Sequence, residues 1–118
     1  MKYLQKNVED ISGLRWVAQE GETPGWDIEY QTSDKRLIRI EVKSTQSQSI
    51  RSVEITANEW RAAKLYRARY RLALVASCLS TEPIIQFIVD PFGAFEKGNI
   101  ELSPVRFQIA WNTLDHRR

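Results

Sequence analysis

The sequence has few of the residues that build disulfides and zinc sites. Its 118 residues include one cysteine and one histidine. A single cysteine cannot form an internal disulfide. One cysteine and one histidine also cannot supply the four ligands of a structural zinc centre within one chain. Cys78 lies in the apolar run LALVASCL, and we interpret it as a small core residue rather than a reactive thiol.

Long apolar runs, internal repeats and a glycine-rich phosphate loop are also missing. No apolar stretch approaches the ~18 residues of a membrane-spanning helix, and residues 1–12 lack the apolar core of a signal peptide. We therefore expect a cytoplasmic protein that is not bound to a membrane. Without a phosphate loop the chain itself cannot be a nucleotide-driven motor. Its length predicts a single domain over residues 1–118, and its 42% hydrophobic and 27% charged content is typical of a globular protein.

Two segments between residues 24 and 45 alternate apolar and polar side chains, which predicts two half-buried β-strands joined as a hairpin. A turn centred on Asp34 makes the numbers of paired residues add up to 68. Asp27 then lies opposite Glu41, with Cβ atoms roughly 4.5–5.5 Å apart. The other predicted pairs are Trp26 with Val42, Ile28 with Ile40, Tyr30 with Ile38 and Glu29 with Arg39.

The predicted pair of carboxylates indicates a metal site. Two acids placed opposite each other repel, and Mg²⁺ is usually held by one or two carboxylates together with water and phosphate oxygens. Lys43 projects from the same face as Glu41, where its ammonium could orient an attacking water or offset charge on a phosphate. This is the chemistry of metal-assisted phosphodiester hydrolysis. The alternative is that these residues are only the solvated face of an amphipathic hairpin.

Asp27 followed by the triplet Glu41-Val42-Lys43 resembles the PD-(D/E)xK nuclease signature. The segments GWDIEY, IRIEVKST and EITANEW are similar to the NO VEIN C-terminal (NOV_C) domain family within that superfamily, and the resemblance covers roughly residues 13–91. It implies a restriction-endonuclease-like fold of the α/β (α+β) class, with a mixed β-sheet flanked by helices.

The resemblance also assigns roles to individual residues. It implies that Asp27, Glu41 and the backbone carbonyl of Val42 bind Mg²⁺, for which Mn²⁺ would substitute, and that Lys43 is the catalytic amine. Glu9 is the candidate for an additional acid from a preceding helix, with Asp10 as the alternative. The family often lends this domain to larger defence or restriction-like machines, so a homodimer or association with a motor or defence protein is expected.

Candidate contacts to nucleic acid lie downstream. The basic residues between positions 61 and 71 are Arg61, Lys64, Arg67, Arg69 and Arg71, and no acidic residue intervenes between Glu59 and Glu82. Arg61 and Lys64 share a helix face that contacts phosphates or is simply solvated. Ser44, Thr45 and Arg51 belong to a polar loop over residues 44–52, with the same two interpretations.

The remaining pattern predicts further elements. Thr56 and Glu59 have the spacing of a capping box, so a helix is expected from there to about Arg69, with Trp60 as a core anchor. A short helix over residues 2–10 is expected to end at Gly13, and residues 90–93 are expected to form a turn. The predicted strands are residues 14–19, 53–55, 72–79, 83–89 and 105–111.

These expectations combine into one functional prediction. The chain is expected to be a small Mg²⁺-dependent nuclease that hydrolyses phosphodiester bonds in DNA, with RNA as an alternative substrate. The alternative from another class is a module with the same fold that binds nucleic acid or a protein without cleaving, because a fold does not guarantee an activity.

Overall fold

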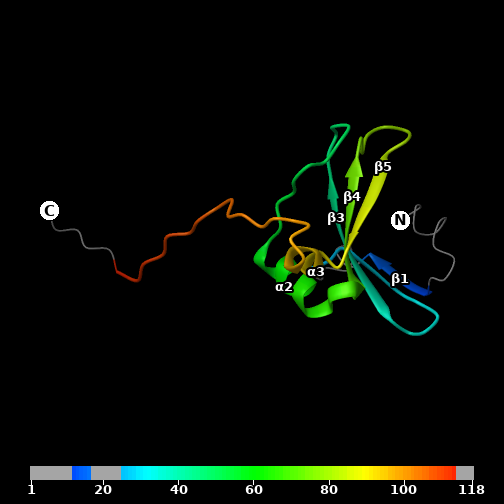
Figure 1. Cartoon of the computed structure of the whole chain (residues 1–118), viewed down its shortest axis with the longest axis horizontal. Coiled ribbons are helices and arrows are strands. Elements are labelled where there is room, and N and C mark those ends of the chain that lie inside the picture. The colour runs from blue at the N-terminus through cyan, green and yellow to red at the C-terminus, as the bar shows by residue number, and fades with distance from the viewer. Residues whose placement is uncertain (1–11, 17–24, 114–118) are drawn as a thin grey trace.

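The computed structural model describes residues 12–16 and 25–113, and its strands form one five-stranded sheet in the order β1-β2-β3-β4-β5. β3 and β4 run parallel, and the other neighbours run antiparallel. This mixed sheet with its helices has the predicted α+β class (Figure 1). The elements in chain order are β1 (Ser12–Trp16), β2 (Ile28–Gln31), β3 (Leu37–Ser44), α2 (Ala57–Tyr66), the 3₁₀ helix η2 (Arg67–Arg69), β4 (Tyr70–Ala76), β5 (Ile84–Val89) and α3 (Pro91–Glu96).

The β2–β3 hairpin has the predicted register. Ile28 pairs with Ile40, Glu29 with Arg39 and Tyr30 with Ile38, so the numbers of each pair add up to 68. The loop is centred on Asp34, because the N–H of Thr32 donates to the carbonyl of Arg36 and the N–H of Lys35 donates to the carbonyl of Thr32, both at 2.9 Å. The Asp34 carboxylate also accepts the Thr32 hydroxyl and lies 3.1 Å from Arg36 Nε.

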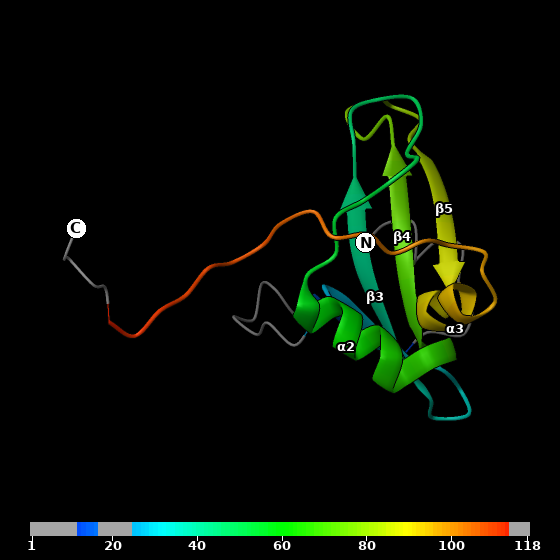
Figure 2. The ribbon, with the colours of Figure 1, turned by 60° about the vertical axis from the view of Figure 1, so that its left-hand side comes forward.

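Helix α2 connects the two parallel strands, as a crossover between parallel neighbours requires. Thr56 and Glu59 form the predicted capping box, each side chain accepting the backbone N–H of the other residue. The α-helix ends at Tyr66, and η2 carries the chain into β4. Figure 2 shows α2 and α3 side by side near one end of the strands, where Trp60 lies 5.6 Å from the rings of both Phe92 and Phe95.

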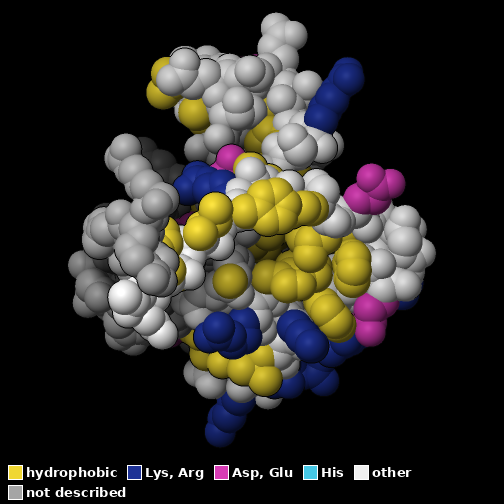
Figure 3. All heavy atoms as spheres, turned by 90° about the vertical axis from the view of Figure 1, so that its left-hand side faces the viewer, with side chains coloured by type: hydrophobic (Ala, Val, Ile, Leu, Met, Phe, Trp, Pro, Cys, Tyr) yellow, Lys and Arg dark blue, Asp and Glu magenta, His cyan; other side chains and the backbone are white. Residues whose placement is uncertain are grey.

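The described part of the chain after α3, residues 97–113, is largely extended. It leads away from the sheet and the helices, so that the molecule measures 66 Å along its longest axis and 34 and 33 Å along the others (Figure 1). Figure 3 views the molecule from the side toward which this segment extends. On this face the Lys and Arg side chains gather in the lower part, beside hydrophobic side chains.

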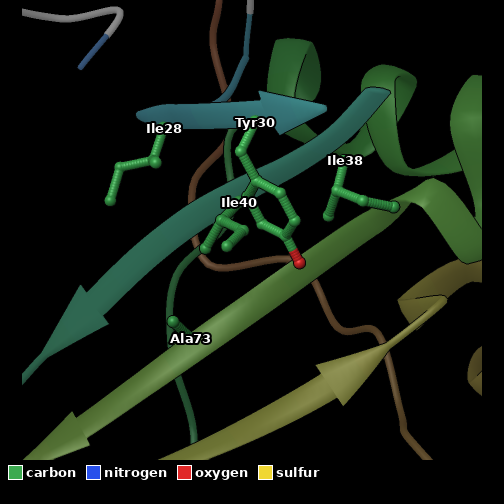
Figure 4. Packing of buried hydrophobic residues seen from close by; sticks show 5 residues of the cluster. All are labelled: Ile28, Tyr30, Ile38, Ile40 and Ala73. Atoms are coloured by element: carbon green, nitrogen blue, oxygen red, sulfur yellow. The ribbon is translucent and has the colours of Figure 1, made fainter. Parts of the chain in front are cut away.

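Buried side chains form two clusters. The first joins β2, β3 and β4, and Figure 4 shows its members: Ile28, Tyr30, Ile38, Ile40 and Ala73, with Val42 packed against them. The second has Ala62, Ala63, Tyr70 and Leu72 at its centre, surrounded by Trp26, Ile55, Trp60, Tyr66, Leu74, Ile88 and Phe92. Trp26 therefore does not pack with Val42 as predicted; it meets Tyr66 edge-on at 5.5 Å, because the regular pairing of β2 begins only at Ile28.

Several predicted boundaries were wrong. The central strand begins at Tyr70 rather than residue 72 and ends at Ala76, because Ser77 turns the chain with a φ of 52°. Cys78 lies in this turn and is half-buried, not a core residue. Gly13 lies inside β1, at an irregularity in the pairing with β2, which is a common place for glycine in a strand. The predicted helix over residues 2–10, with Glu9, lies outside the described residues.

Three downstream predictions also fail. Residues 53–55 and 105–111 are not strands, since neither has a neighbouring strand in the described sheet. Residues 90–93 begin a helix instead of forming a turn. Asp90 is the N-cap of α3 and accepts the Gly93 N–H at 2.9 Å, while Pro91 occupies a first-turn position where its missing N–H is harmless.

Candidate active site

Asp27 is positioned by the turn that precedes it. Gly25 has a φ of +108°, and a Cβ there would lie 2.9 Å from the Asn58 carbonyl oxygen, so the turn presses directly against the first turn of α2. The buried Tyr70 hydroxyl donates to the Gly25 carbonyl at 2.8 Å. The Asp27 side chain then accepts the Val42 N–H through Oδ2 at 2.8 Å. Three elements, α2, β3 and β4, thereby fix the position of this carboxylate.

The pairing at this end of the hairpin is displaced by one residue. The Asp27 N–H donates to the Ile40 carbonyl at 2.9 Å, whereas the regular register would pair Asp27 with Glu41. The carboxylate of Asp27 leans onto the Val42 amide as a result. Asp27 is still close enough that its negative charge acts on Glu41, so the two predicted acids are neighbours.

Glu41 is the one buried charged side chain in the described part of the molecule, with 6% of its surface exposed. Burial, a hydrogen bond with Glu59 and the negative charges of Asp27 and Glu59 raise the pKa of Glu41 to about 9, although the Lys43 ammonium opposes this shift. The carboxyl therefore favours its protonated form at neutral pH. Perturbed carboxyls of this kind are typical of functional sites.

Lys43 is held between two carboxyls. Its Nζ lies 2.8 Å from Glu59 Oε1 and 3.8 Å from Glu41 Oε1. Glu59 Oε1 also accepts the backbone N–H of Thr56 at 3.0 Å. Burial opposes ionisation of Glu59, but the hydrogen bonds from Lys43, Glu41 and Thr56 lower its pKa overall. Glu59, which completes the capping box of α2, is thus also the partner of the predicted catalytic amine.

Glu59 is the site residue that the sequence did not reveal. The spacing from Thr56 to Glu59 indicated only a cap. One signal was available. Glu59 lies in the first turn of the helix that follows the strand carrying Glu41 and Lys43, and a crossover helix packs across the face of its own sheet. An acid at the start of that helix is therefore expected near the strand.

The charges of this cluster suit a divalent cation. A bound cation would favour the ionised form of Glu41, and the three carboxylates together with the Lys43 ammonium would then carry a net charge of −2. The described residues contain no group of three or more His, Cys, Asp or Glu side chains arranged to hold a metal ion. Asp27 and Glu41 as the side-chain ligands of a metal, with water, substrate and backbone oxygens completing its shell, stay a prediction. The Val42 carbonyl as a ligand stays a prediction.

The comparison with family models decides the relationship of the chain to known proteins. The model described as "Protein NO VEIN, C-terminal" matches residues 1–88. The chain belongs to this family. The NO VEIN C-terminal match contains Asp27, Glu41, Lys43 and Glu59 and ends one residue before the end of β5. Comparisons with curated proteins and with solved structures give no match.

The predicted nucleic-acid contacts of this NO VEIN C-terminal domain lie in two places, the first being α2. Arg61 and Lys64 are both exposed there. Lys64 Nζ lies 5.7 Å from the centre of the Phe92 ring, so its stem turns toward α3. Arg67, further along, forms an ion pair with Glu96 of α3, which reduces the positive charge available to a ligand. Contacts of Arg61 and Lys64 with phosphates stay a prediction.

The second place is the end of β3. Ser44 is its last residue and is exposed. Thr45 follows and its N–H donates to the Val75 carbonyl at 2.9 Å, so the start of the loop is fixed to β4. Arg51 is exposed further along the loop. No helix in the described ranges is both long and apolar enough to cross a membrane.

Proposed function

We propose that this NO VEIN C-terminal domain is a metal-dependent nuclease of the PD-(D/E)xK type that hydrolyses phosphodiester bonds in DNA. The observation that carries the proposal is the buried Glu41 with Asp27, Glu59 and Lys43 around it. A buried carboxyl among other carboxyls is unfavourable for folding. A divalent cation is the ligand that would turn this arrangement into a stable one.

Each residue then has a role. Asp27 and Glu41 hold Mg²⁺ or Mn²⁺, which when bound polarises the phosphate and lowers the pKa of a bound water. Lys43, next to Glu41, orients the attacking water and offsets charge on the phosphate. Glu59 is a positioning residue, because it holds the Lys43 ammonium at 2.8 Å.

The surface that we propose for substrate binding is basic. Arg61, Lys64 and Arg51 supply charge for a polyanion, and Ser44 and Thr45 supply hydroxyls at the end of β3, near the cluster that Lys43 joins. Such contacts to phosphate and sugar position a nucleic acid without reading its sequence. We propose DNA as the substrate, with RNA as the alternative, and the cytoplasm as the place of action. A motor or defence protein is the proposed larger partner.

The proposal is tested by cleavage of supercoiled and linear DNA in Mg²⁺, in Mn²⁺ and in EDTA. We expect cleavage with either metal, none in EDTA, and none with Glu41→Gln. A thermal unfolding series supplies an independent measurement: Mn²⁺ should raise the melting temperature of the wild type but not that of Glu41→Gln. Equal stabilisation of both proteins would remove the metal site, and cleavage in EDTA would remove the metal mechanism.

A binding module without cleavage is the second candidate. Its support is that the described cluster is already internally paired: Lys43 is bonded to Glu59 and Asp27 accepts the Val42 N–H. In that case the amine is structural and holds α2 onto β3. DNA binding that is unchanged by EDTA, together with no cleavage under any metal condition, is the outcome that favours this candidate.

A further inference from the structure

Two loops lie side by side at the end of the sheet where β3 ends and β4 turns into β5 (Figures 1 and 2). Their backbones are bonded to each other. The Ser77 N–H donates to the Ser47 carbonyl at 2.7 Å, and the Cys78 N–H donates to the Thr45 carbonyl at 3.0 Å. These bonds make the two loops one fixed extension of the sheet. We call this extension the tip, and it comprises residues 44–52 and 77–81.

The tip is almost without charge. Arg51 is the one charged residue among its fourteen, whereas the 27% charged content of the chain would place about four there. Eight of the fourteen are Ser or Thr, and Gln46 and Gln48 are exposed amides. A loop that only had to be soluble would carry charges of both signs. Uncharged hydrogen-bonding side chains instead suit a ligand that presents its own donors and acceptors, as the grooves of DNA do.

Leu79 is the exposed apolar residue of the tip, with 77% of its surface accessible. The Ser80 N–H donates to the Ser77 carbonyl at 2.9 Å, so Leu79 lies inside a closed four-residue turn. A single exposed leucine on a surface is ordinary, but this one is held by a bonded turn beside exposed amides and hydroxyls. Proteins that wedge a leucine between base steps in the minor groove combine it with Gln and Arg side chains.

The tip begins directly after the predicted catalytic amine. Ser47 lies four residues beyond Lys43, and an extended chain rises roughly 3.3 Å per residue, so at most roughly 13 Å of backbone separates them. The bond from Cys78 to Thr45 brings the turn of Leu79 to the same place. The minor groove is about 6 Å wide and about 7.5 Å deep, so a phosphate on its wall lies within this distance of its bases. One duplex can therefore meet Lys43 and the tip together.

We propose that the tip enters the minor groove of duplex DNA, with Leu79 wedged against a base step and Gln46 and Gln48 hydrogen-bonded to base edges. This inference rests on the proposed function, and it adds the part of the chain that senses sequence. A wedge opens flexible pyrimidine–purine steps most readily, and amides distinguish A·T from G·C through the amino group of guanine. Cleavage should therefore favour such steps and not fall uniformly along the duplex.

The test measures duplex binding in Ca²⁺ as log affinity against log salt, with cleavage followed separately in Mg²⁺ and Mn²⁺. Leu79→Ala should weaken binding about tenfold at every salt concentration, with an unchanged slope because no phosphate contact is lost. Leu79→Met keeps a wedge and should bind within about twofold of the wild type. Leu102→Ala, at a leucine that is 46% exposed outside the tip, is the matched control and should bind as the wild type does.

A fluorescent base reports the insertion directly. 2-Aminopurine placed at a TA step brightens when it is unstacked, so its fluorescence should rise with the wild type and with Leu79→Met but not with Leu79→Ala. Netropsin, which fills the minor groove, should displace the wild type. Full affinity of Leu79→Ala, or wild-type binding without a rise in fluorescence, overturns the tip proposal even if DNA is cleaved. Absence of cleavage with the Leu79 effects intact supports the tip and removes only the nuclease.

Discussion

The two faces of β3 differ in the side chains that they bury: one face is apolar and the other is charged. On one face, Ile38 and Ile40 are 4% and 2% exposed and belong to a cluster of buried apolar side chains. On the other face, toward α2, Glu41 and Lys43 lie among further charged groups. The first face stabilises the fold by burying apolar surface. The second holds an acid whose burial opposes folding, which is the pattern of a site that gives up stability for function.

The largest expected effect comes from the apolar face. Ile40→Ala should lower the free energy of unfolding by about 3 kcal/mol, because it leaves a cavity in a cluster of buried side chains. Urea denaturation measures this change. Val53→Ala, at a site that is 37% exposed, is the matched control and should change stability by less than about 1 kcal/mol. Equal effects at both positions would contradict the assignment of the core.

The charged face should respond in the opposite way, with activity lost and folding kept. Lys43→Ala should reduce cleavage at least about 100-fold, while the chain stays folded because Glu59 still caps α2 through the Thr56 N–H. Glu59→Gln keeps an oxygen for that cap but weakens the hold on the amine, so we expect a smaller loss, roughly tenfold. Unfolding of Lys43→Ala would show that the lysine is structural.

The pH dependence of stability sharpens the comparison further. The pKa of Glu41 is about 9 in the folded chain and 4.5 for an ordinary glutamate. Between these values the folded chain binds a proton that the unfolded chain has lost, so stability from this group is present below pH 4.5 and falls as pH rises toward 9.

Glu41→Gln cannot ionise and should escape that loss. In EDTA the free energy of unfolding of Glu41→Gln should exceed that of the wild type by an amount that grows with pH to on the order of 1–2 kcal/mol. This amount is smaller than the full pKa difference implies, because water screens the charge of Glu41 and the Lys43 ammonium offsets it. Unfolding titrations at about pH 4, 6 and 9 measure the difference. An advantage that is the same at all three values would exclude Glu41 as the titrating group.

The smallest expected effect lies on the solvent side of α2. Replacing Arg61 and Lys64 with Gln should weaken binding to every DNA sequence alike and flatten the salt dependence, by roughly 0.9 in logarithmic slope for each lost contact. The measurement is log affinity against log salt, in Ca²⁺ if that ion supports binding without cleavage. Coincident lines for the two proteins would mean that the helix face is only solvated.

The parts of the fold that depend on neighbours in sequence could be predicted, and those that depend on distant partners could not. The hairpin register followed from local alternation and the loop centred on Asp34, and the cap of α2 followed from Thr56 and Glu59. The contact between Glu59 and Lys43 joins the first turn of α2 to β3, 16 residues apart in sequence, so no local pattern contains it.

Two of the wrong predictions have the same physical origin. Residues 53–55 and 105–111 have strand-like side chains, but a strand also needs a neighbour with free backbone groups, which alternation does not supply. The helix α3 was missed for a local reason: Asp90 and Pro91 suit a turn and a helix start equally well.

The capping box of α2 has a consequence for local unfolding. One oxygen of Glu59 accepts both the Thr56 N–H and the Lys43 ammonium, so fraying of the first helical turn releases the amine as well. Helix ends open more easily than whole domains unfold. The exchange of the Thr56 amide with heavy water should therefore report on the order of the charged cluster, and a ligand that holds Lys43 and Glu59 in place should slow that exchange without touching the amide itself.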